Sequence, residues 1–252
     1  MIKFFQKIRY DLMEKNKTGK YLKYAIGEIV LVVIGILIAL SINNWNEGRK
    51  RINQGKDYIN EINNDVKNDV ANIKNVLYEL EEQKRSSRFV LNIFESKDKF
   101  VADSSLFVDQ NLNTSQIIPV QRQSNTWDEL NATGQVGIID NDSLKLLVKQ
   151  FYEQYDTRIY QYLETPGQVR NANRTTMQEC LNRIGTDKFW KEGGNKNHDK
   201  SWFSCYLNNP KALKEIRVIY SSTHWQLHHF NKLLNKGQSV IEYMDKTIPA
   251  DL

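Results

Sequence analysis

The longest predominantly apolar segment of the chain is residues 24–45, which run from Tyr24 to Trp45. It holds twelve Ile, Leu and Val residues and one ionisable side chain, Glu28. A helix of about 20 apolar residues crosses the ~30 Å hydrocarbon layer of a bilayer, and this many aliphatic side chains outweigh the cost of one carboxylate. The pattern predicts a transmembrane helix, with Tyr24 and Trp45 as anchors at its two interfaces.

Two alternatives to a permanent membrane span stay open for this segment. One is the core helix of a soluble protein, although such helices rarely run so long without a second polar residue. The second is a cleaved signal peptide, because Ala39 and Ser41 form a small-x-small site after the apolar run. The basic segment before the run is longer than in an ordinary signal peptide, which favours an uncleaved signal anchor.

One carboxylate and a row of small residues within the span suggest contacts with another helix. Glu28 is either an interfacial residue that pairs with the lysines before it or a contact for a partner, because an intramembrane carboxylate has to be compensated. Gly27, Gly35 and Ala39 are spaced by multiples of four residues. Such a stripe lets a second helix approach closely, so we expect self-association to be one use of the span.

Downstream, the apolar positions recur with the period of a helix. From Ile52 to Leu80 an aliphatic residue returns every seven positions, which predicts one long amphipathic helix to about Glu95, continuous with the membrane helix. Residues 97–122 lack a period and contain Pro119, so we expect a loop with short elements there.

Shorter helices are predicted for the middle of the chain. Thr126 and Glu129 form a capping-box pattern that opens a short helix ending at Gly134. A second helix is predicted for residues 144–162, ending before Pro166, and a third for residues 168–184. Residues 193–199 are polar and rich in glycine, as in a loop.

The strongest helical pattern follows Pro210. Apolar residues then alternate at spacings of three and four from Leu213 to Met244, which predicts a helix of about 50 Å. The chain is therefore expected to be all-α, with an N-terminal transmembrane helix and an extracytoplasmic bundle that contains two long helices. A dimeric coiled coil is the competing use of the same apolar positions.

Composition and charge narrow the function classes. The chain has 252 residues with 12 Gly and 4 Pro, too few turn residues for an all-β fold. Residues 1–24 carry seven basic and two acidic side chains, whereas residues 25–252 carry as many acidic as basic ones. The formal net charge of +5 thus belongs to a short basic head, and no nucleic acid is expected as a partner.

The same head orients the span. The 20 residues before it hold six Lys and Arg, and the 20 residues after it hold four. This bias places the N-terminus in the cytoplasm. We divide the chain into a cytoplasmic head (residues 1–23), a signal anchor (residues 24–45) and an extracytoplasmic helical domain (residues 46–252).

Parts of the sequence resemble a family of uncharacterised bacterial single-pass membrane proteins, a domain of unknown function. The resemblance lies first in residues 1–9 (MIKFFQKIR), residues 20–40 (KYLKYAIGEIVLVVIGILIAL) and residues 42–47 (INNWNE). A looser match covers residues 127–152, from Trp127 to Tyr152. The resemblance implies an inner-membrane anchor with an extracytoplasmic domain, and it implies no activity or site.

Candidates for chemistry are few. His224 and His228 are four residues apart on one helix face, a spacing that can chelate a transition metal, but the sequence offers no obvious third ligand and exposed or packed histidines are the commoner case. Cys180 and Cys205 are the only cysteines, and an oxidising compartment would permit a disulfide between them, with two buried thiols as the alternative.

No catalytic motif is present, so we expect neither an enzyme nor a cofactor. Five aromatic residues from Phe151 to Tyr162 fit a helix core better than a ligand pocket. The sequence favours a membrane-anchored module that binds another envelope protein or a second copy of itself. The alternative is an extracytoplasmic ligand-binding or sensory domain that signals through a partner, because its cytoplasmic part is too short for an output domain.

Overall fold

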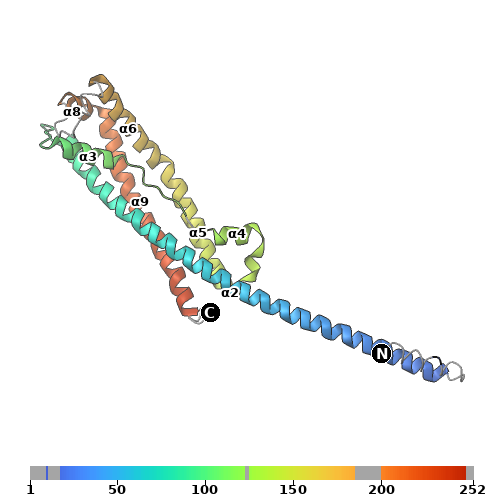
Figure 1. Ribbon diagram of the computed structural model, residues 1–252. Coiled ribbons are helices and arrows are strands. Elements are labelled where there is room, and N and C mark those ends of the chain that lie inside the picture. The colour runs from blue at the N-terminus through green and yellow to red at the C-terminus, as the bar shows by residue number, and fades with distance from the viewer. Residues whose placement is uncertain (1–9, 11–17, 123–124, 185–199, 248–252) are drawn as a thin grey trace. The chain divides into compact units, whose positions relative to one another are not determined.

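The computed structural model describes residue 10 and residues 18–122, 125–184 and 200–247. These residues form helices joined by turns and short extended segments, without a strand among them, so the predicted all-α class is confirmed (Figure 1). The chain divides into two compact units, residues 1–57 and residues 58–252.

The first described helix, α2, extends from Thr18 to Glu95. It contains the apolar segment and the amphipathic segment that follows it, as the heptad pattern predicts, and it ends at Glu95. In the first unit its aliphatic side chains are exposed, whereas in the second unit one stripe of them is buried. The change from an all-round apolar helix to a one-sided one marks where a folded core begins.

The second unit is a helical bundle. Its long elements are the second part of α2, the successive helices α5 (Asp142–Leu163) and α6 (Thr165–Ile184), and α9 (Pro210–Thr247). Both α5 and α6 pack along α9 (Figure 1). The shorter elements are α3 (Ser104–Thr114), α4 (Thr126–Ala132), the 3₁₀ turn η1 (Gln135–Ile138) and α8 (Lys200–Leu207).

Two apolar clusters fill this bundle. One joins α2, α4, α5 and α9 and includes Ile73, Phe151 and Phe230. The other joins α2, α3, α6, α8 and α9 and includes Phe107 and Trp202. The apolar row of α9 contributes to both clusters, so in this structure it packs inside its own chain, as the bundle prediction requires.

A glycine marks the tightest helix contact in the first cluster. A Cβ atom added to Gly237 of α9 would lie 2.5 Å from Cγ2 of Val70 and 2.9 Å from Cε2 of Phe151. Since such distances are far inside van der Waals contact, only glycine lets α9 approach α2 and α5 this closely. The core is therefore closely packed where α9 meets α2 and α5 at Gly237.

Several helix boundaries follow the sequence prediction. The helix after Asn141 runs from Asp142 to Leu163, and the side-chain oxygen of Asn141 accepts the backbone N–H of Leu144 at 2.9 Å. The last helix starts at Pro210, as predicted. Gly134 has a φ of 69°, a left-handed conformation that suits glycine, and lies just after α4.

Other local predictions need correction. The capping box is wrong, because Thr126 is the first residue of α4 and its backbone N–H is accepted by the carboxylate of Asp65 on α2 at 3.1 Å. Residues 97–122 contain a full helix, α3, whose start is capped by Asp103. The helix predicted from residue 168 starts at Thr165, with Pro166 in its first turn, where a missing N–H costs nothing. The predicted loop of residues 193–199 lies outside the described residues.

Candidate functional site

The apolar part of α2 is the first candidate site. Every Ile, Leu and Val from Ile29 to Ile42 is 46–69% exposed. This is the one helix in the described part of the chain that is long and apolar enough to cross a membrane, which makes it a candidate for a single span. Tyr24 and Trp45 are exposed near its two ends, and the guanidinium of Arg49 lies 5.3 Å from the ring centre of Trp45.

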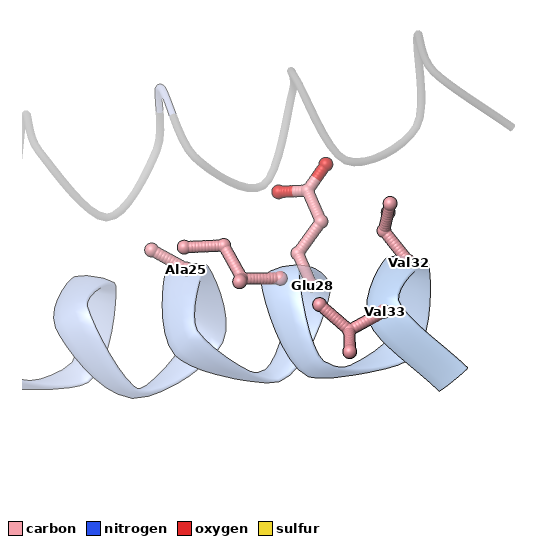
Figure 2. Close-up of a pocket in the computed structure, with 5 residues that line it drawn as sticks. Ala25, Glu28, Val32 and Val33 are labelled. Carbon is pink, nitrogen blue, oxygen red and sulfur yellow. The ribbon is translucent and has the colours of Figure 1, made fainter. Parts of the chain in front are cut away.

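Glu28 lies in a small hollow on this segment. The hollow is lined by one face of the helix, which includes Ala25, Glu28, Val32 and Val33. Figure 2 shows the carboxylate of Glu28 extended away from the helix, between the side chains of Ala25 and Val32. Gly35 has no neighbour within 4 Å of an added Cβ, so the small-residue stripe that it forms with Ala39 is open.

The predicted histidine pair lies on the outward face of α9. His224 and His228 are both exposed. Nδ1 of His224 is 3.2 Å from the carbonyl oxygen of Tyr220, and its ring meets the ring of Tyr220 edge-on. The part of the chain that the structure describes holds no group of three or more His, Cys, Asp or Glu residues placed to bind a metal. Of the two other histidines, His229 follows His228 on α9, and His198 lies outside the described residues.

A cluster of cationic and aromatic side chains surrounds the outward face of α9 where it meets α5. The guanidinium of Arg158 lies 5.9 Å from the ring centre of Trp225, whose side chain remains 42% exposed. The ring of Trp225 also contacts His229 at a centroid distance of 4.2 Å, and His229 contacts His228 at 5.2 Å. We call Arg158, Trp225, His228, His229 and Lys232 the α5–α9 cluster.

The electrostatics of this cluster are positive. Burial lowers the pKa of His229 below its ordinary value, and the charges of Arg158, His228 and Lys232 lower the pKa further. Burial also lowers the pKa of Arg158. Neighbouring cations thus disfavour the charged form of His229, and an anion beside them would be stabilised.

A buried polar layer separates the two apolar clusters of the bundle. Arg170 of α6 is fully buried, and its guanidinium donates to the side-chain oxygens of Gln83, Thr223 and Gln226. It also donates to the carbonyl oxygen of Pro166 at 3.0 Å and lies 5.5 Å from the ring centre of Tyr162. Since α2, α6 and α9 all contribute, this layer fixes how the three helices align.

A second buried network adjoins this layer. The hydroxyl of Tyr206 donates to the side-chain oxygen of Asn173 at 2.7 Å and lies 3.0 Å from that of Asn111, and Asn173 donates to Ser115 at 2.6 Å. Burial raises the pKa of Tyr206 well above its usual range. Burial likewise raises the pKa of Glu215, against a hydrogen bond from Thr176 that lowers it. Most of these buried polar atoms are hydrogen-bonded, whereas Nδ2 of Asn111 and Oε2 of Glu215 have no hydrogen-bond partner among the described residues.

A groove lies between α3 and α6. Its lining combines apolar and polar side chains of both helices and of the segment just after α3: Asp109, Leu112, Asn113, Gln116, Arg174, Met177, Gln178 and Leu181. Its volume of about 650 Å³ is within the range of small-molecule sites. Asp109 and Arg174 are exposed at its walls, while Met177 and Leu181 are buried.

The two cysteines form a disulfide. Cys180 of α6 and Cys205 of α8 are joined across 25 positions of sequence, with their Cα atoms 5.8 Å apart. The bond closes the end of the bundle where α8 packs on α6. It fits the disulfide alternative of the sequence analysis.

The aromatic run of α5 belongs to the core. Phe151, Tyr152, Tyr155 and Tyr162 are buried, whereas Tyr160 is 65% exposed. Burial raises the pKa of Tyr155 to about 12, with a contribution from Asp69. These four rings fill space between helices in the first apolar cluster.

Sequence reasoning missed the polar layer and the α5–α9 cluster. Arg170 and Arg158 belong to no recognisable sequence motif, and the side chains that they contact in space come from other helices, far away in the sequence. Only one signal was available: residues 216–241 contain three Lys and Arg and three of the four histidines, without an acidic residue.

Comparison with known proteins supplies a family and no function. The model of a family of unknown function (DUF6090) matches residues 28–178, more than half of the 252 residues. The match includes most of the apolar segment and the internal residues 127–152 that carry part of the resemblance. Neither the curated proteins nor the solved structures contain a match to the chain. The chain therefore belongs to this family of unknown function.

Proposed function

We propose that this protein is a non-catalytic, membrane-anchored helical module that binds another protein of the bacterial cell envelope or a second copy of itself. The observation that carries the proposal is the exposed apolar stretch from Ile29 to Ile42. So large a contiguous apolar surface is unfavourable in water and is removed from it by a bilayer. The helix is thus an anchor for the bundle that follows.

The proposed location is the inner membrane, with the N-terminus in the cytoplasm and the bundle in the periplasm. The excess of Lys and Arg before the span supports this orientation. The disulfide between Cys180 and Cys205 supports it independently, because disulfides persist in oxidising compartments and are rare in the cytosol.

The bundle itself favours binding to a macromolecule. Its aromatic residues pack against each other in the core, and Gly237 shows how closely the helices meet. The contact between the cation of Arg158 and the ring of Trp225 lies at the surface of α5 and α9. A filled core with a distinctive surface is typical of an interaction domain.

Anchoring is tested by replacing aliphatic residues of the span. The double variant Ile34→Lys, Leu37→Lys should move the full-length protein from the membrane fraction to the alkaline carbonate extract, because each charge opposes insertion by about 3 kcal/mol. The matched control is Leu146→Lys, Leu163→Lys, which changes two exposed apolar residues of α5. If the control is extracted as readily as the span variant, the proposal that this segment anchors the protein in the membrane is wrong.

Orientation is tested with alkaline phosphatase fused after Leu252, since this enzyme is active in the periplasm. An inactive fusion together with an active fluorescent protein at the same position would reverse the proposed topology.

Binding is tested by crosslinking and pull-down of the full-length protein from membranes, together with light scattering of the detergent-solubilised protein. One specific envelope protein, or a self-associated form, supports the interaction role. A monomer that captures no specific partner overturns it.

A second candidate is the extracytoplasmic ligand-binding domain. The groove between α3 and α6 favours it, because Met177 and Leu181 offer an apolar floor and Arg174 a charged wall. Native mass spectrometry of the full-length protein should then show a bound small molecule that Arg174→Glu removes and Arg183→Glu, on the same helix, retains. Identical spectra without a bound molecule in wild type and variants would exclude this candidate.

A further inference from the structure

The surface where α5 meets α9 has an unusual density of positive charge and aromatic rings. The guanidinium of Arg158, the exposed indole of Trp225 and the ring of His229 are in mutual contact through Trp225. His228 contacts His229, and Lys232 follows His229 by three residues on α9, so it lies on the same face of that helix. Four cationic or titratable basic groups thus converge around one tryptophan.

Within α5 and α9, both described from end to end, these groups have no carboxylate partner. Residues 216–241 of α9 include no Asp or Glu. On α5, the carboxylate of Glu153 faces Lys149 at 3.8 Å, and that of Asp156 faces Arg122 at 3.3 Å. Glu164, just after α5, accepts the hydroxyl of Tyr160 at 2.8 Å. The nearby acidic side chains are therefore engaged elsewhere.

The guanidinium of Arg158 keeps hydrogen-bonding capacity. Among the described residues it donates from Nη1 to the side chain of Gln161, while its buried Nε has no acceptor. Nδ1 of His229 is also buried without a hydrogen-bond partner within the same part of the chain. A guanidinium presents five N–H donors in a fork that matches a carboxylate. Arg158 is half-buried and donates one hydrogen bond, to Gln161, so its side chain keeps donors for an arriving carboxylate.

We propose that the α5–α9 cluster is a docking site for an acidic segment of a partner protein, with Arg158 and Lys232 binding carboxylates and Trp225 packing against the segment. This inference rests on the interaction role proposed above and names the chemistry of the partner. Arg and Trp are the residues that carry most binding energy in protein interfaces, particularly where they lie together. Their positive surroundings select a negative segment and steer its approach.

The composition of the cluster distinguishes an acidic peptide from a membrane surface or a nucleic acid. Phosphate-rich surfaces are bound by many long basic side chains spread over a face. This cluster has one lysine and one half-buried arginine set among rings, and residues 25–252 have no excess of positive charge. It suits a short segment in which a few carboxylates alternate with apolar side chains.

The test uses the full-length protein in nanodiscs of neutral phosphatidylcholine and a fluorescent ten-residue peptide of alternating Glu and Leu. Fluorescence anisotropy should show saturable binding that weakens as salt increases. The same peptide with Gln in place of Glu should bind at least about tenfold more weakly, since hydrogen bonds to charged groups contribute roughly 1.5–3 kcal/mol.

Variants locate the site. Arg158→Gln and Lys232→Gln should each weaken binding of the Glu peptide by about tenfold, and Trp225→Ala by a similar factor. The matched control is Lys149→Gln, which removes the same charge from α5. Lys149 is nine positions from Arg158, which is about two and a half turns of α5, so the two side chains leave opposite sides of that helix. The control should leave the affinity within about twofold.

Three results would overturn the inference. The first is that the Gln peptide binds as tightly as the Glu peptide. The second is that Lys149→Gln weakens binding as much as Arg158→Gln. The third is that the protein in nanodiscs binds vesicles containing phosphatidylglycerol but does not bind the Glu peptide. The last result would assign the cluster to a lipid surface.

The pull-down from membranes separates this inference from the interaction role. If Arg158→Gln and Trp225→Ala capture the same partner as wild type, the interaction role stands and the α5–α9 cluster is not its site. If wild type captures no partner while the Glu peptide still binds through Arg158, the cluster stands and the interaction role loses its support.

Discussion

Arg170 on α6 donates hydrogen bonds from both Nε and Nη2 to the one side-chain oxygen of Gln83 on α2, 87 residues earlier in the chain. Thr223 and Gln226 of α9 accept further hydrogen bonds from the same Nη2. The charge is thus shared among neutral acceptors of two other helices. A buried group of this kind is satisfied in one alignment of the helices, so it specifies the register of the bundle.

Replacing Arg170 with Met should lower the free energy of unfolding by about 3 kcal/mol or more. Methionine fills much of the volume, but it leaves the buried acceptors of Gln83 and Gln226 without donors, at about 1–3 kcal/mol each. The measurement is urea unfolding of the full-length protein in detergent, followed by circular dichroism.

The control for this variant is Arg85→Met. Arg85 is exposed on α2 and pairs with Glu82 one turn earlier, so its loss should change stability by no more than about 0.5 kcal/mol. An Arg170→Met protein as stable as wild type would show that the polar layer adds nothing to stability.

Adding one methyl group at Gly237 tests the tightest helix contact. Gly237→Ala should destabilise the bundle by about 1–3 kcal/mol, because the new Cβ would meet Val70 and Phe151 well inside contact distance. Gly167→Ala is the matched control, since its Cβ would lie 3.5 Å from the nearest atom, the carbonyl oxygen of Tyr162. Thermal unfolding should show a lower midpoint for the first variant and an unchanged or higher one for the second. Equal midpoints would contradict the close approach.

The long helices could be predicted because their pattern is local. Ile52 to Leu80 and Leu213 to Met244 repeat with a helical period. The rows from Ile59 to Leu80 and from Leu213 to Met244 lie on the faces of α2 and α9 that pack in the core, whereas Ile52 is 63% exposed. Asn141 similarly predicts the start of α5, since its side chain accepts the backbone N–H of the residue three positions later and so caps the helix.

The remaining features depend on contacts between distant segments, which no local pattern records. Arg170 would be expected at the surface from its sequence neighbours, yet Gln83 and Gln226 surround it. Thr126 fits a capping box, but the carboxylate of Asp65 caps α4 instead, because tertiary packing brings α2 to its first turn. The α5–α9 cluster likewise needs Arg158 from another helix.

Removing the disulfide should destabilise the end of the bundle. Cys180→Ser with Cys205→Ser opens a loop closed across 25 positions, for which the loss of chain constraint is about 3 kcal/mol. Unfolding of the full-length double variant, compared with wild type with and without reductant, is the measurement. Reductant should move wild type toward the variant and leave the variant unchanged. If wild type without reductant is no more stable than the double variant, the bond does not stabilise the bundle.

Glu215 gives the bundle a pH dependence of opposite sign to that of paired carboxylates. Burial raises the pKa of Glu215 above its ordinary value of 4.5, so the unfolded chain loses this proton at lower pH than the folded one. The stability that this group provides is therefore fully present below about pH 4.5 and is lost as pH rises toward its folded pKa. Glu215→Gln removes that loss, because the amide keeps an oxygen for Thr176 and carries no charge.

The variant should thus gain stability relative to wild type between acid and neutral pH. The measurement is the difference in unfolding free energy between Glu215→Gln and wild type, taken at several values from pH 4 to pH 8. The difference should grow in favour of the variant as pH rises. Glu242→Gln makes the same charge change at an exposed position of α9 and should show a nearly constant difference. A constant difference for Glu215→Gln as well would mean that the burial of this carboxyl has no effect on its ionisation.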